Sequence, residues 1–445
     1  MTRRLVLVLT LCLLFPRARM VAQTSTGEMS VTVLDASGAV VPNAAVVITG
    51  SDTGNTLRTL RANDRGLAPV PLLPPGKYDV TTSAQGFKTS IRRAVQVSVG
   101  DVVSVTVMLE TGSSTQSVTV TAQAPLVEDK SATLAQVVSQ KQLIDLPLNG
   151  RNYLAVANLT AGAIPSTGSR DQTFSAYGNT GLQNAFLLDG ARNENYLRGL
   201  DNRTRDMVRP PLDALSEFTV QTSNFSAEFG AAAGGVVNAI TKSGTNELHG
   251  SAYEFLRNDR LDAINFFAQT KPLLVRNQYG GSLGGPVKKD KAWLFGAYEG
   301  YHNRSESAST STVPTVAQRG GNFGATAIFD PATTRLNPSG AGYIRDQFAG
   351  NAIPATKLNP IGVSLLNRYP LANVAGSNTL YIANVTQKQD TKNGVVRGDV
   401  QLTDRDSLFA RYSRTSGLLN AAAALPAPAQ APIDRQIDSS SAGLG

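Results

Sequence analysis

Cysteine and histidine are nearly absent from this sequence, which has 445 residues but only one cysteine and two histidines. The cysteine, Cys12, lies within an apolar stretch near the N-terminus. The rest of the chain therefore contains no disulfide, no thiolate nucleophile and no cysteine metal site. The histidines are His249 and His302, and no assembled set of catalytic residues accompanies either of them. We therefore expect no enzymatic activity, no cofactor and no metal site.

Charge of one sign is also lacking once the N-terminus is set aside. The formal net charge is +8, from 41 basic and 33 acidic residues. Four of the arginines lie within residues 1–22, which contain no acid, so the remainder carries 37 basic and 33 acidic residues, a net charge of +4. No cluster of Lys and Arg interleaved with aromatic residues is present. The composition therefore argues against nucleic-acid binding.

No apolar run reaches the length of about 20 residues that a membrane-spanning helix needs. Met1–Arg4 is a short basic region, Leu5–Phe15 is apolar, and Pro16 begins a polar exit. This order is typical of a signal peptide. We expect a signal peptide over residues 1–22 with cleavage after Ala22, so that the mature protein is exported and contains no cysteine.

Strands, by contrast, are strongly indicated. The chain has 40 glycines and 22 prolines together with abundant Thr, Ser and Val, a composition that favours β structure with many turns. Residues 24–112 alternate apolar and polar positions in several short runs, such as Val95, Val97 and Val99 before the turn Gly100–Asp101. We predict a small β-sandwich here.

A Thr/Ser-rich linker follows at residues 113–124, and it contains one short β-prone run, Val118, Thr119, Val120, Thr121 and Ala122. An ordinary linker strand is the plain interpretation of this run. Hydrogen bonding by its backbone to a partner strand is the functional one, because many β-prone sequences can take part in strand addition.

Residues 125–245 read as a further compact unit. Val137–Ile144 could form a short helix, and Phe186–Leu188 a buried strand that ends at Asp189-Gly190. Asp189 and Asp201 could be mistaken for a catalytic carboxylate pair. Nothing in the sequence places them together, so we interpret both as turn or loop carboxylates.

A glycine-rich junction, Glu217–Asp262, separates this unit from the rest of the chain. Gly234 and Gly235 allow close backbone approach because they lack a Cβ, and Ser243–Asn246 are turn formers. In the next strand, His249–Asn258, aromatic residues alternate with small or charged ones. The aromatic face would be core in a soluble sandwich, and it would meet lipid in a membrane barrel.

Downstream strands repeat this two-residue alternation, which is typical of a barrel wall. The clearest runs are Gln278–Leu283, Val395–Leu402 and Ser407–Ser413; Ala292–His302 is less regular, because Glu299 has the parity of Trp293 and Phe295. The connections expected between the strands alternate in length. Residues 288–291 and 403–406 are short, whereas residues 259–275 and 303–393 are long, as in outer-membrane barrels with short periplasmic turns and long external loops.

The segment NFSAEFGAAAGGVVNAITKSGTNELHGSAYEFLRNDRLDAINFF resembles the plug-to-barrel junction of TonB-dependent outer-membrane receptors of the Oar-like group, which carry a carboxypeptidase-regulatory-like domain in front. VTVLDASGAVVPNAAVVIT and LPPGKYDVTTSAQGF resemble that domain, and DLPLNGRNYLAVANLTAGA and YGNTGLQNAFLLDGARNENY resemble plug segments. The regulatory-like domain implies no catalysis, since a zinc carboxypeptidase needs a His/Glu/His set and both histidines lie far from it.

The resemblance assigns a role to each part of the chain. Residues 24–112 would be the regulatory-like domain, 125–245 the plug, and 246–445 the first strands and external loops of a barrel in the cell outer membrane. Val118–Ala122 would be the TonB box, which pairs with a periplasmic TonB-type energy-transducing protein. Phe329–Asn373 resembles the large external loop and is the best candidate for contact with an unidentified ligand.

Two further expectations complete the interpretation. Gly280–Gly284 matches the G-x-S-x-G nucleophile pattern, but Gly285-Pro286 follow where a helix should start, so we interpret the glycines as part of a strand.

Only about five barrel strands are found, whereas closed bacterial barrels have at least about 8, and the tail ALPAPAQAPIDRQIDSSSAGLG looks like a loop. We therefore expect a mainly β protein that is the N-terminal part of a longer receptor; the alternative is a secreted or surface β-sandwich binding protein without transport activity.

Overall fold

The structure is a computed structural model and is built almost entirely from strands. It describes residues 26–113, 117–121, 133–146, 148–165, 174–194, 207–225, 229–230, 232–264, 271–403, 406–426 and 429–445. The predicted signal peptide and Asp201 lie outside the described residues. Among the described residues, no helix has both the length and the apolar character that a bilayer crossing would require.

The N-terminal strands form two sheets that face each other, here called the sandwich. One sheet has the order β4-β1-β7 and the other β3-β2-β5-β6-β8. The strands are β1 (Gly27–Asp35), β2 (Ala45–Gly50), β3 (Thr56–Arg61), β4 (Leu67–Leu73), β5 (Gly76–Ser83), β6 (Thr89–Val97), β7 (Val102–Leu109) and β8 (Ser117–Thr121). Alternate side chains point inward and form one core, in which Val31, Ile48 and Val80 are fully buried.

The next unit, here called the plug, is a five-stranded sheet of order β13-β12-β15-β14-β9 with short helices on one face. Its elements are β9 (Leu134–Ser139), α2 (Gln140–Asp145), η1 (Asn149–Arg151), η2 (Tyr153–Leu159), β10 (Ala163–Pro165), β11 (Phe174–Ala176), η3 (Gly181–Gln183), β12 (Ala185–Leu188), β13 (Ala191–Arg192), η4 (Leu212–Ala214), β14 (Leu215–Ser223) and β15 (Val236–Thr241). The predicted strand at Phe186–Leu188 is confirmed as part of β12.

The helix predicted at Val137–Ile144 is only partly right, because Val137 and Val138 belong to β9. That strand pairs with β14 from Ser139 to Leu134. The helix begins at Gln140, where Ser139 and Gln142 form a reciprocal capping box. Sheet pairing therefore determines the first half of this segment and local capping the second.

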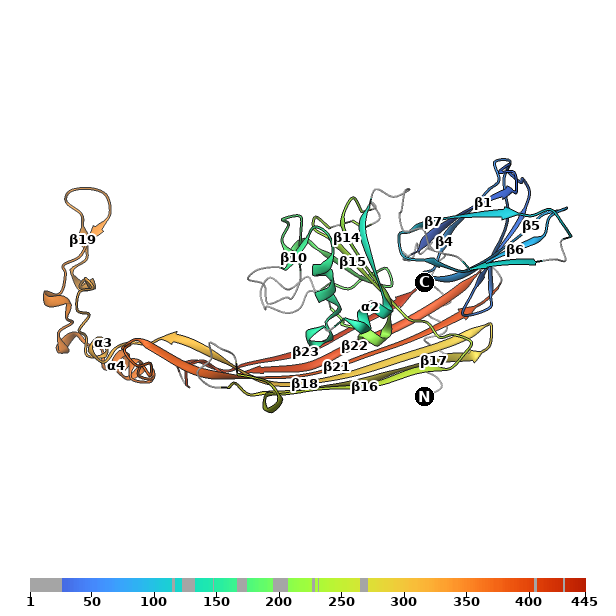
Figure 1. The fold of residues 1–445 in the computed structure, drawn as a ribbon. Coiled ribbons are helices and arrows are strands. Elements are labelled where there is room, and N and C mark those ends of the chain that lie inside the picture. Colours follow the sequence, from blue (N-terminus) through green and yellow to red (C-terminus); the bar gives the residue numbers. More distant parts are fainter. Residues whose placement is uncertain are drawn as a thin grey trace, which may run out of the picture.

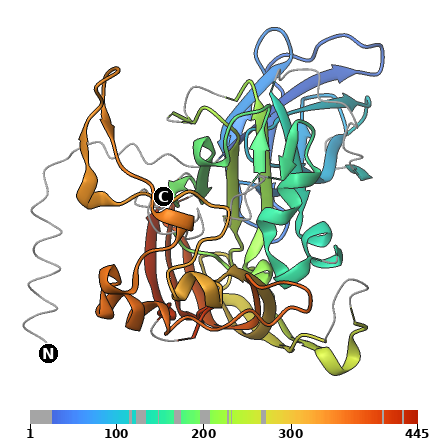
Figure 2. The same cartoon turned by 90° about the vertical axis from the view of Figure 1, so that its left-hand side faces the viewer.

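The C-terminal half forms a six-stranded antiparallel sheet of order β16-β17-β18-β21-β22-β23, here called the wall. Its strands are β16 (His249–Asn258), β17 (Leu274–Lys288), β18 (Ala292–Thr312), β21 (Leu380–Gln401), β22 (Ser407–Ala421) and β23 (Ile433–Leu444). Figures 1 and 2 show the plug and the sandwich lying over the same face of this curved sheet. The glycines of the G-x-S-x-G pattern lie within β17 as expected.

Two predictions about the wall are wrong. The tail that looked like a loop contains β23, which pairs with β22 from Ala421 to Ala410. The long connection expected at residues 303–393 is shorter, because β18 and β21 stay paired up to Thr312 and Leu380. β23 is mostly polar on both faces, so backbone hydrogen bonding rather than an apolar stripe holds it in the sheet. The extended part of β21 is more apolar, and its Val385 is buried.

Side chains of the wall alternate between its two faces, as the repeat predicted. On the face away from the plug, Leu283, Val396 and Tyr412 are at least half exposed. On the face toward the plug, Gln278 and Arg411 are buried. The inner face also buries apolar side chains such as Phe295 and Val395, which pack against Ala214 of the plug. An apolar outer face and an inner face that carries buried polar and charged side chains fit a membrane barrel that surrounds a plug.

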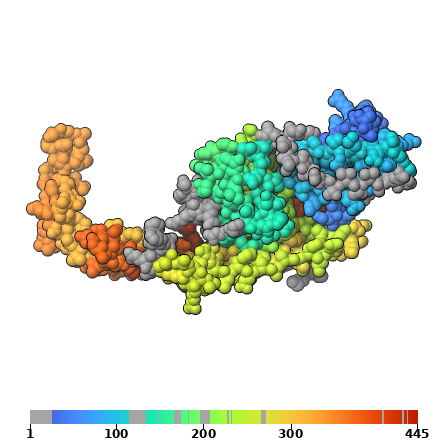
Figure 3. Space-filling view, in the orientation of Figure 1, coloured from blue at the N-terminus to red at the C-terminus, as the bar shows by residue number. Residues whose placement is uncertain are grey.

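Residues 313–379 form a long loop that stands apart from the sandwich and the plug, at the far end of β18 and β21 (Figures 1 and 3). It contains α3 (Val316–Arg319), η6 (Pro331–Thr333), β19 (Arg335–Leu336), β20 (Tyr343–Ile344), η7 (Ala349–Asn351), η8 (Ala355–Lys357) and α4 (Pro360–Leu366). The outermost parts of β18 and β21, residues 307–312 and 380–385, form its stalk, and among the described residues they pair with no third strand.

Candidate functional site: the interface between plug and wall

The carboxylate of Asp189 occupies the centre of the interface between plug and wall. The residue follows β12 and has a positive φ of 49°, which Asp adopts more readily than most residues. Its oxygens accept hydrogen bonds from the backbone N–H of Thr241 and from its hydroxyl, both at 2.8 Å. These bonds hold the carboxylate at the end of β15, with its remaining lone pairs toward the wall.

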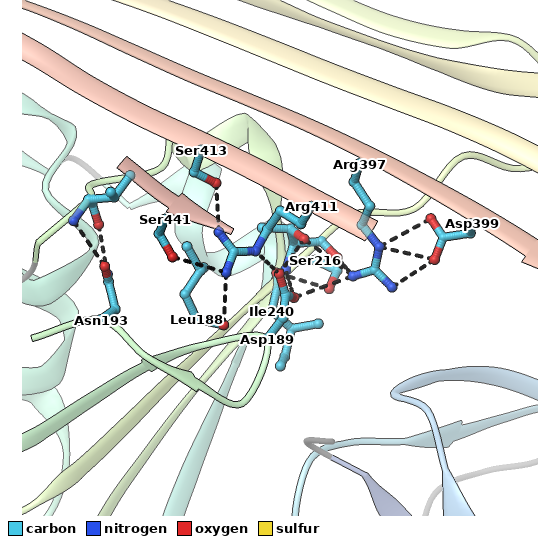
Figure 4. Close-up of polar contacts among 12 residues, drawn as sticks. Leu188, Asp189, Asn193, Ser216, Ile240, Arg397, Asp399, Arg411, Ser413 and Ser441 are labelled. Atoms are coloured by element: carbon cyan, nitrogen blue, oxygen red, sulfur yellow. Dashed lines mark hydrogen bonds and ion pairs between the residues drawn. The ribbon is translucent and has the colours of Figure 1, made fainter. Parts of the chain in front are cut away.

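Two wall arginines reach this carboxylate (Figure 4). Arg411 of β22 places Nε 2.7 Å from Asp189 Oδ2, and Arg397 of β21 places Nη1 3.3 Å from Asp189 Oδ1. Arg397 also donates to the backbone carbonyl of Thr241 at 3.0 Å and pairs with Asp399 on its own strand at 2.9 Å. The cluster therefore joins one plug acid to two neighbouring strands of the wall.

Burial makes this cluster energetically important. The side chain of Arg411 is fully buried and that of Asp189 is 3% exposed. Arg411 donates further hydrogen bonds to Leu188 O, Ser413 Oγ and Ser441 Oγ. A buried pair of this kind adds little net stability over an apolar pair, but loss of one partner leaves an uncompensated charge and costs about 3–5 kcal/mol. The ion pair therefore fixes the position of the plug on the wall, and removal of either charged partner alone should destabilise the interface.

A second charged cluster joins plug and wall with the signs reversed. Arg151, at a positive φ of 50° beside Gly150, supplies the cation from the plug. It forms ion pairs with Asp213 of the plug and with Glu299 of β18, where Nε lies 3.7 Å from Oε2. Its guanidinium lies 4.4 Å from the ring centre of Tyr253 and 4.7 Å from that of Phe255. Cation–π contacts and ion pairs thus hold one arginine between two wall strands.

This cluster corrects one expectation and explains an irregularity. The aromatic face of β16 was expected to meet lipid, but Tyr253 and Phe255 point to the plug because they flank Arg151. The hydroxyl of Tyr253 donates to Glu299 Oε2 at 2.9 Å. Glu299 has the parity of the inward residues because it faces Arg151, and this contact accounts for the irregular pattern seen in the sequence.

Close approach within the plug depends on the predicted glycines. A Cβ on Gly235 would lie 2.9 Å from the ring of Phe174, closer than such atoms approach in proteins. Gly235 also donates its N–H to Asn184 Oδ1 at 2.8 Å. The prediction of close backbone approach at this position is confirmed.

The candidate TonB box lies in β8, which is described from Ser117 to Thr121; Ala122 lies outside the described residues. This strand pairs in parallel with β6, with Val120 opposite Arg92. It is the last strand of its sheet in the described part of the chain. One edge of β8 is therefore paired with the sandwich and the other is free of strand partners among the described residues.

The histidines lie apart from the two clusters. His249 contacts Thr245 at 3.2 Å, and His302 contacts Asp390 at 2.7 Å on the outer face of the wall. In the described ranges no group of three or more His, Cys, Asp or Glu side chains is arranged to hold a metal ion.

Sequence reasoning missed the charged interface. Asp189 was interpreted as a turn carboxylate, and Arg151 was not singled out. The available signal was the parity of Arg397 and Arg411, since a charged residue on the inward face of a barrel strand needs a partner within the barrel. Which plug residue meets it depends on the three-dimensional fold.

Two family models and one curated protein are similar to parts of this chain. Family models match two segments: "Outer membrane beta barrel domain" at residues 240–445 and "Carboxypeptidase regulatory-like domain" at residues 28–110. The chain is similar to the TonB-dependent transporter Oar of Myxococcus xanthus, with 26% identity over 312 residues that cover 67% of this chain and 29% of that protein. The chain thus spans less than a third of the length of this curated relative.

Solved structures with detectable similarity include an outer membrane transporter and a ferric enterobactin receptor. The outer membrane transporter YddB of Escherichia coli is 15% identical, with a TM-score of 0.39 over 64% of this chain and 33% of that chain. A variant of the ferric enterobactin receptor PfeA of Pseudomonas aeruginosa is 17% identical, with a TM-score of 0.36 over 65% of this chain and 34% of that chain.

Proposed function

Because this chain is a homologue of the TonB-dependent transporter Oar, with a carboxypeptidase regulatory-like domain and an outer-membrane β-barrel domain, we propose that it works as an outer-membrane receptor that admits an unidentified ligand. Its sandwich lies on the periplasmic side of the barrel, and its plug lies within the barrel. Energy reaches the plug from a TonB-type protein of the inner membrane. The proposal includes the export signal at residues 1–22, and it treats residues 24–112, 113–124, 125–245 and 246–445 as sandwich, linker, plug and barrel.

The observation that supports this function best is the charged interface between plug and wall. Asp189 and Arg151 connect the plug to wall strands at two separate places, and both contacts are buried. Buried charged contacts favour one arrangement of the plug, yet they exchange for hydration when the plug moves. Such an interface suits a plug that is held in place at rest and rearranges when work is applied to it.

The wall is the first part of a closed barrel in this proposal. Its six strands leave β16 and β23 as edges of the described sheet, and unpaired backbone groups in lipid cost several kcal/mol each. Further strands, supplied beyond the wall in a longer protein, would pair with both edges and close the barrel around the plug. Ligand contact is assigned to the loop that contains Phe329–Asn373.

Contact with the transducer is assigned to Val118, Thr119, Val120, Thr121 and Ala122. Because β8 is an edge strand among the described residues, the transducer can add a strand to it through backbone hydrogen bonds. We expect Val120→Pro to weaken binding of the purified periplasmic domain of a TonB-type protein at least about tenfold, because proline lacks the backbone N–H.

Val120→Ala is the matched control, since it keeps the N–H and should change binding less than about twofold. The measurement is a titration with the full chain in detergent, followed by anisotropy of a dye on an introduced cysteine, because the mature sequence has no other thiol. Equal affinity of the proline and alanine variants would remove this segment from the contact.

A further inference from the structure

Two turns at one end of the sandwich reach beyond its own sheets. One turn, residues 51–55, joins β2 to β3, and the other, residues 98–101, joins β6 to β7. The strand register aligns Gly50 with Tyr78 and Tyr78 with Val95, so both turns lie at the same end of the five-stranded sheet. Figure 3 shows this end of the sandwich close to the wall.

The turn at residues 98–101 is seated on the plug. The backbone N–H of Val99 donates to Glu217 Oε1 of β14 at 2.9 Å, and both residues are buried. A Cβ on Gly100 would lie 3.3 Å from the side-chain nitrogen of Gln221, four residues further along the same strand. Glu217 and Gln221 share the face of β14 that is turned away from the plug core, which contains Phe218. This contact therefore covers the outer face of the central plug sheet.

The turn at residues 51–55 is seated on the wall. Asn246, in the connector between β15 and β16, donates its side-chain amide to the backbone carbonyl of Thr53 at 2.6 Å. The same side chain bonds to Asp290, in the turn between β17 and β18, and accepts from Trp293 Nε1 at 3.0 Å. Asn246 thus ties the sandwich to the hairpin formed by β17 and β18.

We propose that the sandwich is a two-point brace across the seam between plug and barrel: it holds Glu217 of the plug through one turn and Asn246 of the barrel entrance through the other, and both contacts must be released before the plug can rearrange. The proposal rests on the function proposed above, in which the plug moves. It assigns to the regulatory-like domain a mechanical role that the plug–wall contacts alone do not provide.

The arrangement has a quantitative consequence. When one contact is broken, the other keeps the freed turn at an effective concentration in the millimolar range or above, so the broken end remains near its site. Loss of one contact alone should therefore have little effect on the plug. Loss of both contacts should release the sandwich and expose the covered face of β14.

Hydrogen exchange of the full chain in detergent tests the brace without any need for transport. One variant replaces residues 51–55 with an Asn-Gly two-residue turn, which shortens the hairpin and removes its tip. The other is Glu217→Ala, which removes the acceptor for Val99 N–H. We expect exchange of peptides that cover β14 and residues 242–246 to rise less than about threefold in each single variant and at least about tenfold in the double variant.

Asp52→Ala and Glu217→Gln are the matched controls. The first changes the tip but leaves the backbone acceptors of the turn, and the second keeps an acceptor for Val99; their combination should exchange like the unmodified protein. Unmodified exchange in the double variant would overturn the brace, and so would a single variant as fast as the double one. Failure of Val120→Pro to weaken transducer binding would leave these exchange results unaffected, so the two proposals fail separately.

Discussion

Removal of the Asp189 carboxylate is the most direct perturbation of the interface between plug and wall. In Asp189→Asn, the fully buried Arg411 loses its only acidic partner among the described residues, whereas Arg397 keeps Asp399. An uncompensated buried charge costs about 3–5 kcal/mol. Taking about 3 kcal/mol, at 1.4 kcal/mol for each factor of ten, opening of the plug from the wall becomes about 100-fold more frequent.

The assay is hydrogen exchange of peptides that cover β12 and β15, measured on the full chain in detergent. Asp438→Asn is the matched control, because Asp438 pairs with Arg414 at 3.1 Å on the outer face, where both side chains are about half exposed. Exposed pairs contribute about 0–1 kcal/mol. We expect the control to change exchange by less than about fivefold.

A second variant separates loss of the pair from general damage. Arg411→Met removes the cation and keeps much of its volume, so the double variant Asp189→Asn/Arg411→Met leaves no buried charge at this position. We expect the double variant to recover at least half of the free energy lost in Asp189→Asn. Equal exchange in Asp189→Asn and Asp438→Asn, or no recovery in the double variant, would refute the reasoning.

Three further predictions concern the plug and its contacts. Arg151→Met should destabilise the plug–wall contact by about 3 kcal/mol, because Glu299 stays buried without its cation, and exchange of the β14 peptides would measure this; a change below threefold would argue against the pair. Burial raises the pKa of Glu217 to about 7 from an ordinary value of 4.5, so the docked state binds more protons. Docking of the sandwich should therefore be strongest below about pH 4.5 and weaken by up to about 3 kcal/mol as the pH rises through 7. Hydrogen exchange of the Val99 amide, corrected for the intrinsic pH dependence of exchange, measures this, and a flat profile would contradict it. Glu217→Gln should abolish the pH dependence. Gly235→Ala should destabilise the plug by about 1–3 kcal/mol, since its methyl group would collide with Phe174, as a lower urea midpoint would report; an unchanged midpoint would contradict it.

The wall strands were predictable where a single physical signal dominated. Val396 and Val400 alternate with the charged residues Arg397 and Asp399, and this alternation alone gives the faces of β21. β23 carried no such signal, because its residues are polar on both sides and only pairing with the backbone of β22 defines it. Sequence periodicity reports burial, and it does not report hydrogen bonding between polar strands.

The charged interface was only half predictable for a related reason. The inward parity of Arg397 and Arg411 is visible in the sequence, yet their partner Asp189 lies more than 200 residues away along the chain. The contact that Tyr253 makes could not be predicted either, because an aromatic side chain suits contact with lipid and contact with a buried arginine equally well. Parity and residue type identify a face of the wall, and only the fold identifies what that face meets.

The stalk of the long loop has a mechanical consequence. β18 spans 21 residues and β21 spans 22, whereas a barrel strand crosses a membrane in about 9–11. Residues 307–312 and 380–385 continue outward as a two-stranded ribbon, about 20 Å long at about 3.3 Å per residue. A two-stranded ribbon twists and bends more easily than a wide sheet. The loop is therefore joined to the wall by a flexible two-stranded ribbon. The distance of the loop from the wall depends on the bending stiffness of these two strands as much as on their length.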